Sequence, residues 1–273
     1  MTQSTDAALH AARMYERYMV PRMFAPWATV LLDFAELEVG ERVLDVACGT
    51  GSVARQAAQR VGASGVVSAL DLNPAMLTVA RETAAPDAPA IDWQQGSAQS
   101  LPFADAAFAA VTCQQGLQFF PDRLGALREM CRVLEPGGRA ALLVQQAIEY
   151  NPLSYRLNQA GRARVGADIF MAPFALGDAA ILEKLMADAG FVDIEIKAEV
   201  RTVRHPEPEH VAAFLLQGAA AAVPMLAAMT QVQRQHLGEQ LQNDLADWIT
   251  SHTEGGYLVD EMAVHLARGR RLD

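Results

Sequence analysis

Short apolar runs alternate with helical stretches along the first half of the chain. Apolar residues at helical spacing over 7–37 predict two or three short helices, with Pro21 and Pro26 breaking the run. Runs rich in β-forming residues then predict strands at 42–46, 65–70, 91–94, 108–113 and 139–144. Helices are predicted between them at 52–61, 74–83 and 123–134, the last ended by Pro136-Gly137-Gly138. Strands that alternate with helices in this way indicate parallel βαβ units with right-handed crossovers.

The second half of the chain continues this pattern less regularly. A helix is predicted over 178–189, and strands over 191–203 and 262–267. Helices are predicted over 207–252, where an apolar stripe consists of Leu237, Leu241, Leu245, Trp248 and Ile249. We therefore predict an α/β fold with a seven-stranded, mostly parallel sheet, helices on both faces, and added helices at the N-terminus and late in the chain.

Charge and cysteine content narrow the possible functions. The formal net charge is -10 and no basic stripe is present, which disfavours nucleic acid as a partner. A short basic cluster at Arg268, Arg270 and Arg271 is interpreted as solvated. The three cysteines are odd in number and lack metal-ligand spacing, so we expect no disulfide framework and no metal site. Reduced thiols, with no visible secretory signal, favour a cytoplasmic protein.

One uncharged stretch, 211–229, is nearly long enough to span a bilayer. Most of its residues are alanine, which contributes little to membrane insertion, and Pro224 interrupts it. We interpret it as two buried helices broken at Pro224 and expect no membrane span.

The most informative segment joins the first predicted strand to the next helix. The strand carries Asp45, and Gly49-Thr50-Gly51 then turns the chain into a helix whose N-terminus presents free N–H groups. About twenty residues later, Asp71 ends the second strand, where an acid can accept hydrogen bonds from both ribose hydroxyls. This arrangement predicts a nucleotide-like cofactor at the carboxyl ends of the strands.

Two enzyme classes share this arrangement. The segment 49–54 also fits the dinucleotide fingerprint of nicotinamide-dependent oxidoreductases, so an NAD(P) enzyme is the alternative. Asp45, four residues before Gly49, favours a cation such as the amino group or sulfonium of S-adenosyl-L-methionine instead. The only two lysines, Lys184 and Lys197, lie outside this half of the chain, which weakens the oxidoreductase reading. A non-catalytic S-adenosylmethionine-binding protein is a third reading.

Four segments, in order across 41–146, resemble the motifs of class I S-adenosylmethionine-dependent methyltransferases. They are Val43–Gly51, Asp71–Leu77, Gly96–Phe103 with the strand after it, and Glu129–Arg139. The similarity is greatest to the ubiquinone/menaquinone-biosynthesis-like group of small-molecule methyltransferases. It implies a Rossmann-like fold, S-adenosyl-L-methionine as cofactor and methyl transfer to a small acceptor. Two residues depart from the family: Ala47 stands where glycine is frequent, which requires a negative φ there, and Ser97 stands where aspartate is frequent.

The resemblance divides the chain, taken as a single methyltransferase domain over 1–273, into functional parts. A helical cap is expected over 1–40 and a cofactor-binding core over 41–146. Substrate-side additions are expected over 147–177 and 206–255, and the sheet is completed by 178–205 and 256–273. A homodimer is compatible with the sequence.

The resemblance and the strand-end positions together give a set of candidate site residues. The predicted cofactor-binding residues are Asp45, Ala47, Gly49, Gly51, Asp71, Leu72, Met76, Ser97, Ala98 and Gln114. Candidates for acceptor orientation or catalysis are Tyr18, Gln115 and Glu149. No strong base is evident, so proximity and orientation are the expected catalytic effects, and O-, N- and C-methylation stay open.

The segments flanking the core are rich in Met and aromatic residues, and no cluster of basic residues occurs in them. Ligand pockets are mostly apolar, and Met-rich walls adapt to irregular shapes. We therefore expect a largely apolar or aromatic acceptor in a pocket closed by the helices at 1–37 and 207–252.

Overall fold

The computed structural model describes residues 2–85, 89–220 and 223–272, with side chains from residue 6 onward. Its strands are β1 Arg42–Val46, β2 Val66–Asp71, β3 Ile91–Gln95, β4 Phe108–Gln114, β5 Leu134–Gln145, β6 Phe191–Pro206, β7 Thr253–Glu254 and β8 Tyr257–Arg271. The α-helices of the first part are α1 Thr2–Met14, α2 Ala25–Phe34, α3 Ser52–Val61, α4 Pro74–Thr83 and α5 Arg123–Val133. Those that follow are α6 Pro152–Val165, α7 Ala179–Asp188, α8 Val211–Ala219, α9 Pro224–Ala228, α10 Gln231–Asp244 and α11 Ala246–Ser251.

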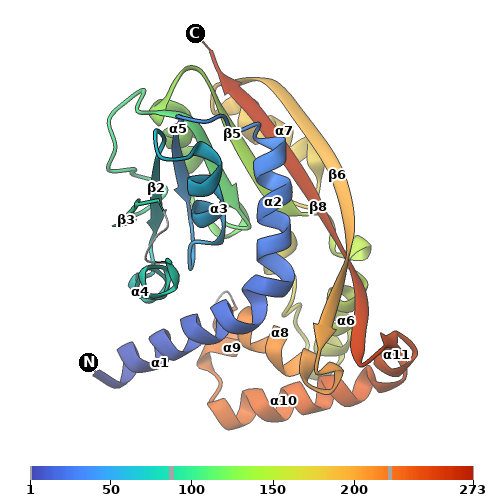
Figure 1. Cartoon of the computed structure of the whole chain (residues 1–273). Helices are drawn as coiled ribbons and strands as arrows, with labels where there is room; N and C mark the ends of the chain where they lie inside the picture. The colour runs from blue at the N-terminus through green and yellow to red at the C-terminus, as the bar shows by residue number, and fades with distance from the viewer. Residues whose placement is uncertain (1, 86–88, 221–222, 273) are drawn as a thin grey trace. The chain divides into compact units, whose positions relative to one another are not determined.

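The strands form one sheet in the order β3-β2-β1-β4-β5-β8-β6, with the two-residue β7 paired antiparallel to β8. The pairs β1–β2, β2–β3, β1–β4 and β4–β5 are all parallel. Helices α2 and α3 lie on one face of these strands and α5 lies on the other (Figure 1). The predicted α/β fold is thus confirmed, and the strand order reverses between β1 and β4, where open sheets of this kind bind ligands.

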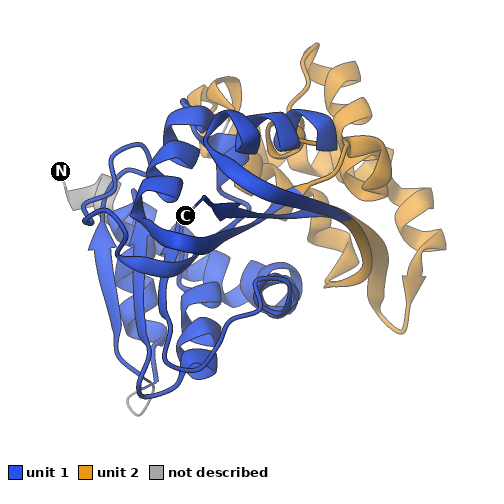
Figure 2. Cartoon of the chain, turned by 90° about the horizontal axis from the view of Figure 1, so that it is seen from above, with its two compact units in different colours: residues 1–144, 179–197, 265–273 blue, residues 145–178, 198–264 orange. Residues whose placement is uncertain are grey.

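The described residues divide into two compact units (Figure 2). Unit 1 contains 1–144, 179–197 and 265–273, and unit 2 contains 145–178 and 198–264. In unit 1 the central strands are buried on both faces, as their continuous apolar runs require.

The N-terminal helices differ from the prediction that Pro21 and Pro26 break them. Between α1 and α2 the chain continues without interruption as a π-helix, η1 Tyr15–Phe24, with Pro21 inside it. The wider π turn joins the N–H of Ala25 to the carbonyl of Val20, five residues back. Pro26 falls in the first turn of α2, where a missing N–H has no cost.

Other element boundaries extend or shift the predicted ones. Helix α5 ends at Val133, and Pro136-Gly137-Gly138 lies within β5, where the register with β4 shifts. The last predicted strand is the longer β8, and it contains the basic cluster that was expected to be solvated. Arg270 is exposed, but Arg268 and Arg271 are partly buried, and all three donate hydrogen bonds to main-chain carbonyls of unit 1, among them those of Phe34 and Gly137. These arginines therefore anchor β8.

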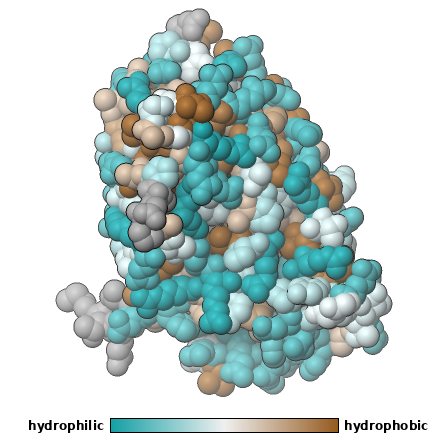
Figure 3. All heavy atoms as spheres, in the orientation of Figure 1, coloured by the Kyte–Doolittle hydropathy of each residue, from teal (hydrophilic) through white to brown (hydrophobic). Residues whose placement is uncertain are grey.

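Unit 2 packs around an apolar cluster of its own. Leu237, Leu241, Leu245 and Ile249 are buried in it and Trp248 packs against it, as the stripe predicted. Pro224 begins α9, which confirms the break there; residues 221–222 lie outside the described part of the chain. Among the described residues, no helix is both long and apolar enough to cross a membrane. The face drawn in Figure 3 is largely hydrophilic, with apolar residues scattered over it.

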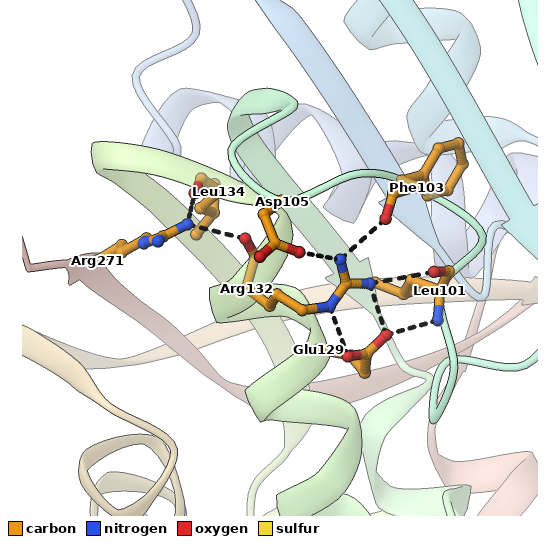
Figure 4. Close-up of polar contacts among 7 residues, drawn as sticks. All are labelled: Leu101, Phe103, Asp105, Glu129, Arg132, Leu134 and Arg271. Carbon is orange, nitrogen blue, oxygen red and sulfur yellow. Dashed lines mark hydrogen bonds and ion pairs between the residues drawn. The ribbon is translucent and has the colours of Figure 1, made fainter.

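A network of hydrogen bonds centred on Arg132 holds the loop between β3 and β4 in place (Figure 4). Arg132, on α5, donates to both carboxylate oxygens of Glu129 and to Asp105. It also donates to the carbonyls of Leu101 and Phe103, so all five of its N–H groups are used. Glu129 in turn accepts from the N–H of Leu101 at 2.8 Å. The loop is thereby fixed beside α5.

Candidate active site

The loop after β1 is built around the buried carboxylate of Asp45, which is 1% exposed. One of its oxygens accepts from the N–H of Ala54 in α3 at 3.1 Å, and the other accepts from the hydroxyl of Thr112 in β4 at 3.0 Å. Asp45 therefore ties together a strand, the helix that follows it and the neighbouring strand. Asp45 thus fixes both the strand before the loop 47–51 and the helix after it.

Three residues of this loop have a left-handed backbone. Gly49 has φ +56 and Gly51 has φ +87, and a Cβ on Gly51 would lie 2.3 Å from the ring of Trp93. Ala47 has φ +57. The prediction that alanine would sit there with a negative φ is wrong, because the turn requires the region in which only glycine is free of strain.

Asp71, at the end of β2, closes the loop from the other side. Its two oxygens accept from the N–H of Gly49 and of Asn73, both at 2.8 Å. Asn73, not Asp71, caps α4, since its side chain accepts from the N–H of Ala75. Each carboxylate oxygen retains a second lone pair, so Asp71 can still accept from ribose hydroxyls.

A pocket opens at this loop, lined entirely by unit 1. Its lining comprises Tyr15, Val20, Phe24, Asp45, Ala47, Cys48, Gly49, Thr50, Ser52, Val53 and Gln114. Three of these residues come from η1, so the N-terminal segment contributes one wall of this pocket. Its lining contains no residue of 207–252, and closure of an acceptor pocket by both segments stays a prediction. The ring of Tyr15 lies 5.0 Å from that of Phe24, centroid to centroid, and 3.9 Å from where a Cβ on Gly49 would be.

Burial disfavours negative charge on the acidic groups around the pocket. It raises the pKa of Asp45 to about 7 and raises the pKa of Asp71, although hydrogen bonds to each carboxylate oppose the shift. Burial also raises the pKa values of Tyr15 and Cys48. Arg55, beside the loop, pairs with Glu16 at 2.9 Å. A bound cation would offset the cost of ionising Asp45 and Asp71.

The residues present fit S-adenosyl-L-methionine. The lining contains no lysine or arginine, which suits a ligand that carries a sulfonium and an ammonium group. The hydroxyl of Thr50 and the amide oxygen of Gln114 are buried without a partner. Such acceptors are costly unless a ligand pairs with them.

The remaining predicted cofactor residues lie outside this lining, and their roles stay predictions. Leu72 is 69% exposed, and Met76 packs beside Ala12 of α1. The hydroxyl of Ser97 accepts from the N–H of Gln99, and Ala98 is buried.

The three candidate catalytic residues lie in different surroundings. Tyr18, on η1, is partly buried and has the guanidinium groups of Arg17 and Arg22 over its ring. Glu149 is exposed in the short helix Ile148–Tyr150 of unit 2. Gln115 directly follows β4 with φ +55. Their catalytic roles stay predictions.

Gln118 is a polar residue that the sequence analysis missed. It is 3% exposed and donates to Gln115. The only signal for it was a third glutamine in the run Gln114-Gln115-Gly116-Leu117-Gln118, where no periodicity separates a buried amide from an exposed one.

In the described ranges, no group of three or more His, Cys, Asp or Glu side chains could hold a metal ion.

Comparison with known proteins identifies the fold. The YcgJ protein of Bacillus subtilis matches with a TM-score of 0.59 and 19% identity over 90% of this chain and 98% of that one. Phosphoethanolamine N-methyltransferase 2 of Haemonchus contortus, solved with S-adenosylhomocysteine, has a TM-score of 0.54 and 19% identity over 91% of this chain and 53% of that one. Both likenesses show the class I methyltransferase fold.

Proteins with similar sequences identify the family to which the chain belongs. A 2-phytyl-1,4-naphtoquinone methyltransferase of Thermosynechococcus vestitus is 44% identical over 43% of this chain and 52% of the relative, so the match spans about half of that protein. A ubiquinone/menaquinone biosynthesis C-methyltransferase UbiE of Neisseria meningitidis is 34% identical over 62% of this chain and 74% of the relative. The model of the ubiE/COQ5 methyltransferase family matches residues 15–160, more than half of the chain. The resemblance seen in the motifs is therefore confirmed, and the chain belongs to the ubiE/COQ5 methyltransferase family.

Proposed function

We propose that the protein transfers a methyl group from S-adenosyl-L-methionine to a ring carbon of a small, largely apolar acceptor of the quinone type. The observation that carries the proposal is the pocket at the β1 loop. It combines the buried carboxylate of Asp45 at its wall and the partly buried carboxylate of Asp71 behind Gly49 with unpaired acceptors on Thr50 and Gln114. Family membership favours this reading over a nicotinamide-dependent oxidoreductase.

S-adenosyl-L-methionine supplies a methyl group already activated on a sulfonium. Transfer forms a carbon–carbon bond, breaks the methyl–sulfur bond and releases the proton of the ring carbon. The protein has to hold the acceptor in line with the breaking bond and exclude water, and orientation of this kind can lower a barrier by roughly 7–11 kcal/mol. Asp45 and the loop 47–51 orient the donor, and η1 shields it from solvent.

Two observations support the acceptor class. Relatives are named for phytyl-naphthoquinone and for ubiquinone/menaquinone biosynthesis. The wall formed by η1 contributes Tyr15, Val20 and Phe24, which are apolar or aromatic surfaces suited to a flat ring. The pocket lining contains no basic residue that could hold a phosphate ester.

Turnover tests the proposal directly. The purified protein is incubated with S-adenosyl-L-methionine and chemically reduced 2-phytyl-1,4-naphthoquinone, and S-adenosylhomocysteine and methylated product are measured together. Stoichiometric formation of both is expected. Binding of S-adenosylhomocysteine without any turnover would support the non-catalytic alternative, and binding of NADH in its place would overturn the cofactor assignment.

A further inference from the structure

The N-terminal helix that forms one wall of the pocket turns a corner at η1. Helices α1 and α2 run in different directions, and η1 joins them at the turn (Figure 1). In an α-helix of about 3.6 residues per turn, Tyr15 and Phe24 would be about two and a half turns apart and would lie on opposite faces. The wider π turns instead bring their ring centroids to within 5.0 Å of each other. The π geometry therefore directs both rings toward the pocket that they line.

The corner lacks part of the main-chain hydrogen bonding of a regular helix. Pro21 has no N–H, so one carbonyl of the preceding turn loses its helical donor. The side chain of Arg22 compensates in part, since its Nη1 donates to the carbonyl of Tyr18 at 2.6 Å and to that of Arg17 at 3.4 Å. Proline is a common cause of helix kinks, and π turns occur frequently at functional sites. The helix is therefore best able to bend at this corner.

An ion pair fastens the corner to the rest of the pocket. The Nη2 of Arg55, on α3, lies 2.9 Å from the Oε1 of Glu16, and the two side chains are only 20% and 18% exposed. The Nη1 of the same guanidinium donates to the main-chain carbonyl of Thr50 in the loop 47–51. Glu16 follows Tyr15 in η1, so Arg55 joins the wall that η1 forms to the loop that lines the other part of the pocket.

This fastening leaves one carboxylate oxygen unsatisfied. The Oε2 of Glu16 is buried and accepts no hydrogen bond from the described residues. Water would hydrate it if η1 moved away, and the cost of its burial would be recovered. That gain offsets part of the loss of the ion pair, so moving η1 away costs less than breaking a fully satisfied contact would.

These observations together describe a hinge and a latch. The inference rests on the proposed function, which places S-adenosyl-L-methionine in this pocket. We propose that η1 is a gate over the pocket, hinged at Pro21 and latched by the Glu16–Arg55 pair. The methyl donor enters and S-adenosylhomocysteine leaves while the pair is broken. Once the pair has formed again, η1 excludes water from the sulfonium during methyl transfer.

A latch affects binding rates in a way that a ligand-binding residue does not. The ligand passes the same opening in both directions, so a weaker latch raises the association and dissociation rate constants together and leaves Kd nearly unchanged. Glu16→Gln keeps the shape of the side chain and removes its charge. We expect both rate constants for S-adenosylhomocysteine to rise about fivefold, the size expected for the loss of one ion pair. Surface plasmon resonance on the immobilised full chain measures both constants.

Two further variants make the test decisive. Glu82→Gln is the matched control, because it removes an exposed pair with Arg13 that joins α1 to α4 and does not involve the pocket. Its rate constants should equal those of wild type. Pro21→Ala returns an N–H to the exposed outer side of the corner and should slow both association and dissociation. It also tests the gate independently if Glu16→Gln does not fold.

The outcomes separate the gate from the proposed function. Wild-type rate constants in Glu16→Gln, or faster exchange in Pro21→Ala, would overturn the gate and leave the methyltransferase assignment intact. A higher dissociation rate constant with unchanged association would show that Glu16 only holds the bound ligand, which also overturns the gate. Failure of wild type to bind S-adenosylhomocysteine would overturn the cofactor assignment itself.

Discussion

Two groups of polar side chains in unit 1 differ in how completely their hydrogen bonds are made. Around Arg132 every N–H of the guanidinium has a partner, and Glu129 uses both of its oxygens (Figure 4). At the carboxyl ends of β1 and β4, by contrast, buried atoms of Thr50, Gln114 and Gln118 have none. The first arrangement is complete without a ligand, whereas the second still has hydrogen-bonding atoms to offer one.

The largest expected effect is the loss of the complete network. Arg132→Met should lower the free energy of unfolding by about 3 kcal/mol, because it leaves Glu129 and the carbonyls of Leu101 and Phe103 without partners. Arg132 lowers the pKa of Glu129, so this stability is present above the usual range of a glutamate and is lost as pH falls through the lowered value. Urea unfolding at pH 7 measures the effect.

A matched control is Lys184→Met, which breaks an exposed pair with Asp188 one helical turn away. Exposed pairs of this kind contribute about 0.3–0.5 kcal/mol. If both variants unfold at the same urea concentration, the distinction between the complete network and ordinary surface pairs fails.

At the incomplete site, Asp71→Ala should act on binding. The predicted role of Asp71 is to accept hydrogen bonds from the ribose hydroxyls. On that prediction, removing the carboxylate leaves those hydroxyls unpaired, and S-adenosylhomocysteine should bind more weakly by about 1–3 kcal/mol, a five- to 150-fold rise in Kd. Isothermal titration calorimetry gives the constant, and Asp92→Ala, an exposed carboxylate on β3, serves as control. An unchanged Kd in a folded Asp71→Ala protein would remove the ribose assignment.

The pKa of Asp45 predicts a pH dependence of binding. Its value of about 7 in the free protein means that the fold favours the protonated carboxyl group. The stability that the protonated Asp45 contributes is complete below about pH 4 and is lost as pH rises through 7. A ligand that carries both a sulfonium and an ammonium group prefers the ionised form, so affinity for S-adenosyl-L-methionine should rise about eightfold between pH 6 and 7.5. Asp45→Asn should abolish this rise, and a slope that persists in the variant would assign it to another group.

The smallest expected effect is a gain in stability at Ala47. Ala47→Gly relieves the left-handed strain and should raise the free energy of unfolding by about 0.5–1 kcal/mol. This gain is the difference between the strain that is relieved and the conformational entropy that glycine loses on folding. Ala11→Gly, in the ordinary helix α1, should do the opposite by about 1 kcal/mol. Thermal unfolding of the two variants compares the signs; destabilisation by both would mean that the loop is not strained.

The sequence was most informative where local signals and burial agree. Helices α3 and α4 and strand β1 begin and end at the predicted residues, because a glycine turn, a proline or a short apolar run marks their limits. The continuous helix through Pro21 was not predictable, since the π turn that accommodates it has no local signature.

At the site, the motif located Asp45, Gly49 and Gly51, which lie together in or beside the pocket. It could not give the φ of Ala47, because sequence shows the residue and not the backbone that the turn imposes. Nor could it distinguish the buried Gln118 from the exposed Gln99, since amides at both positions follow no periodic pattern. These features depend on how the β4 turn packs on the β1 loop.

The strand order has a consequence for how the chain acquires its structure during synthesis. Strands β1 to β5 can pair with one another as soon as residue 145 has been made, and only the edge of β5 that later receives β8 then has no partner. Strand β6 cannot join them, because among the described strands it pairs with β8 alone, which is translated more than fifty residues later. For that interval β6 and one edge of β5 have unpaired backbone groups, the kind of exposed strand that recruits other nascent chains. Ribosome-bound intermediates that end before residue 257 are therefore the species of this protein expected to depend most on chaperones.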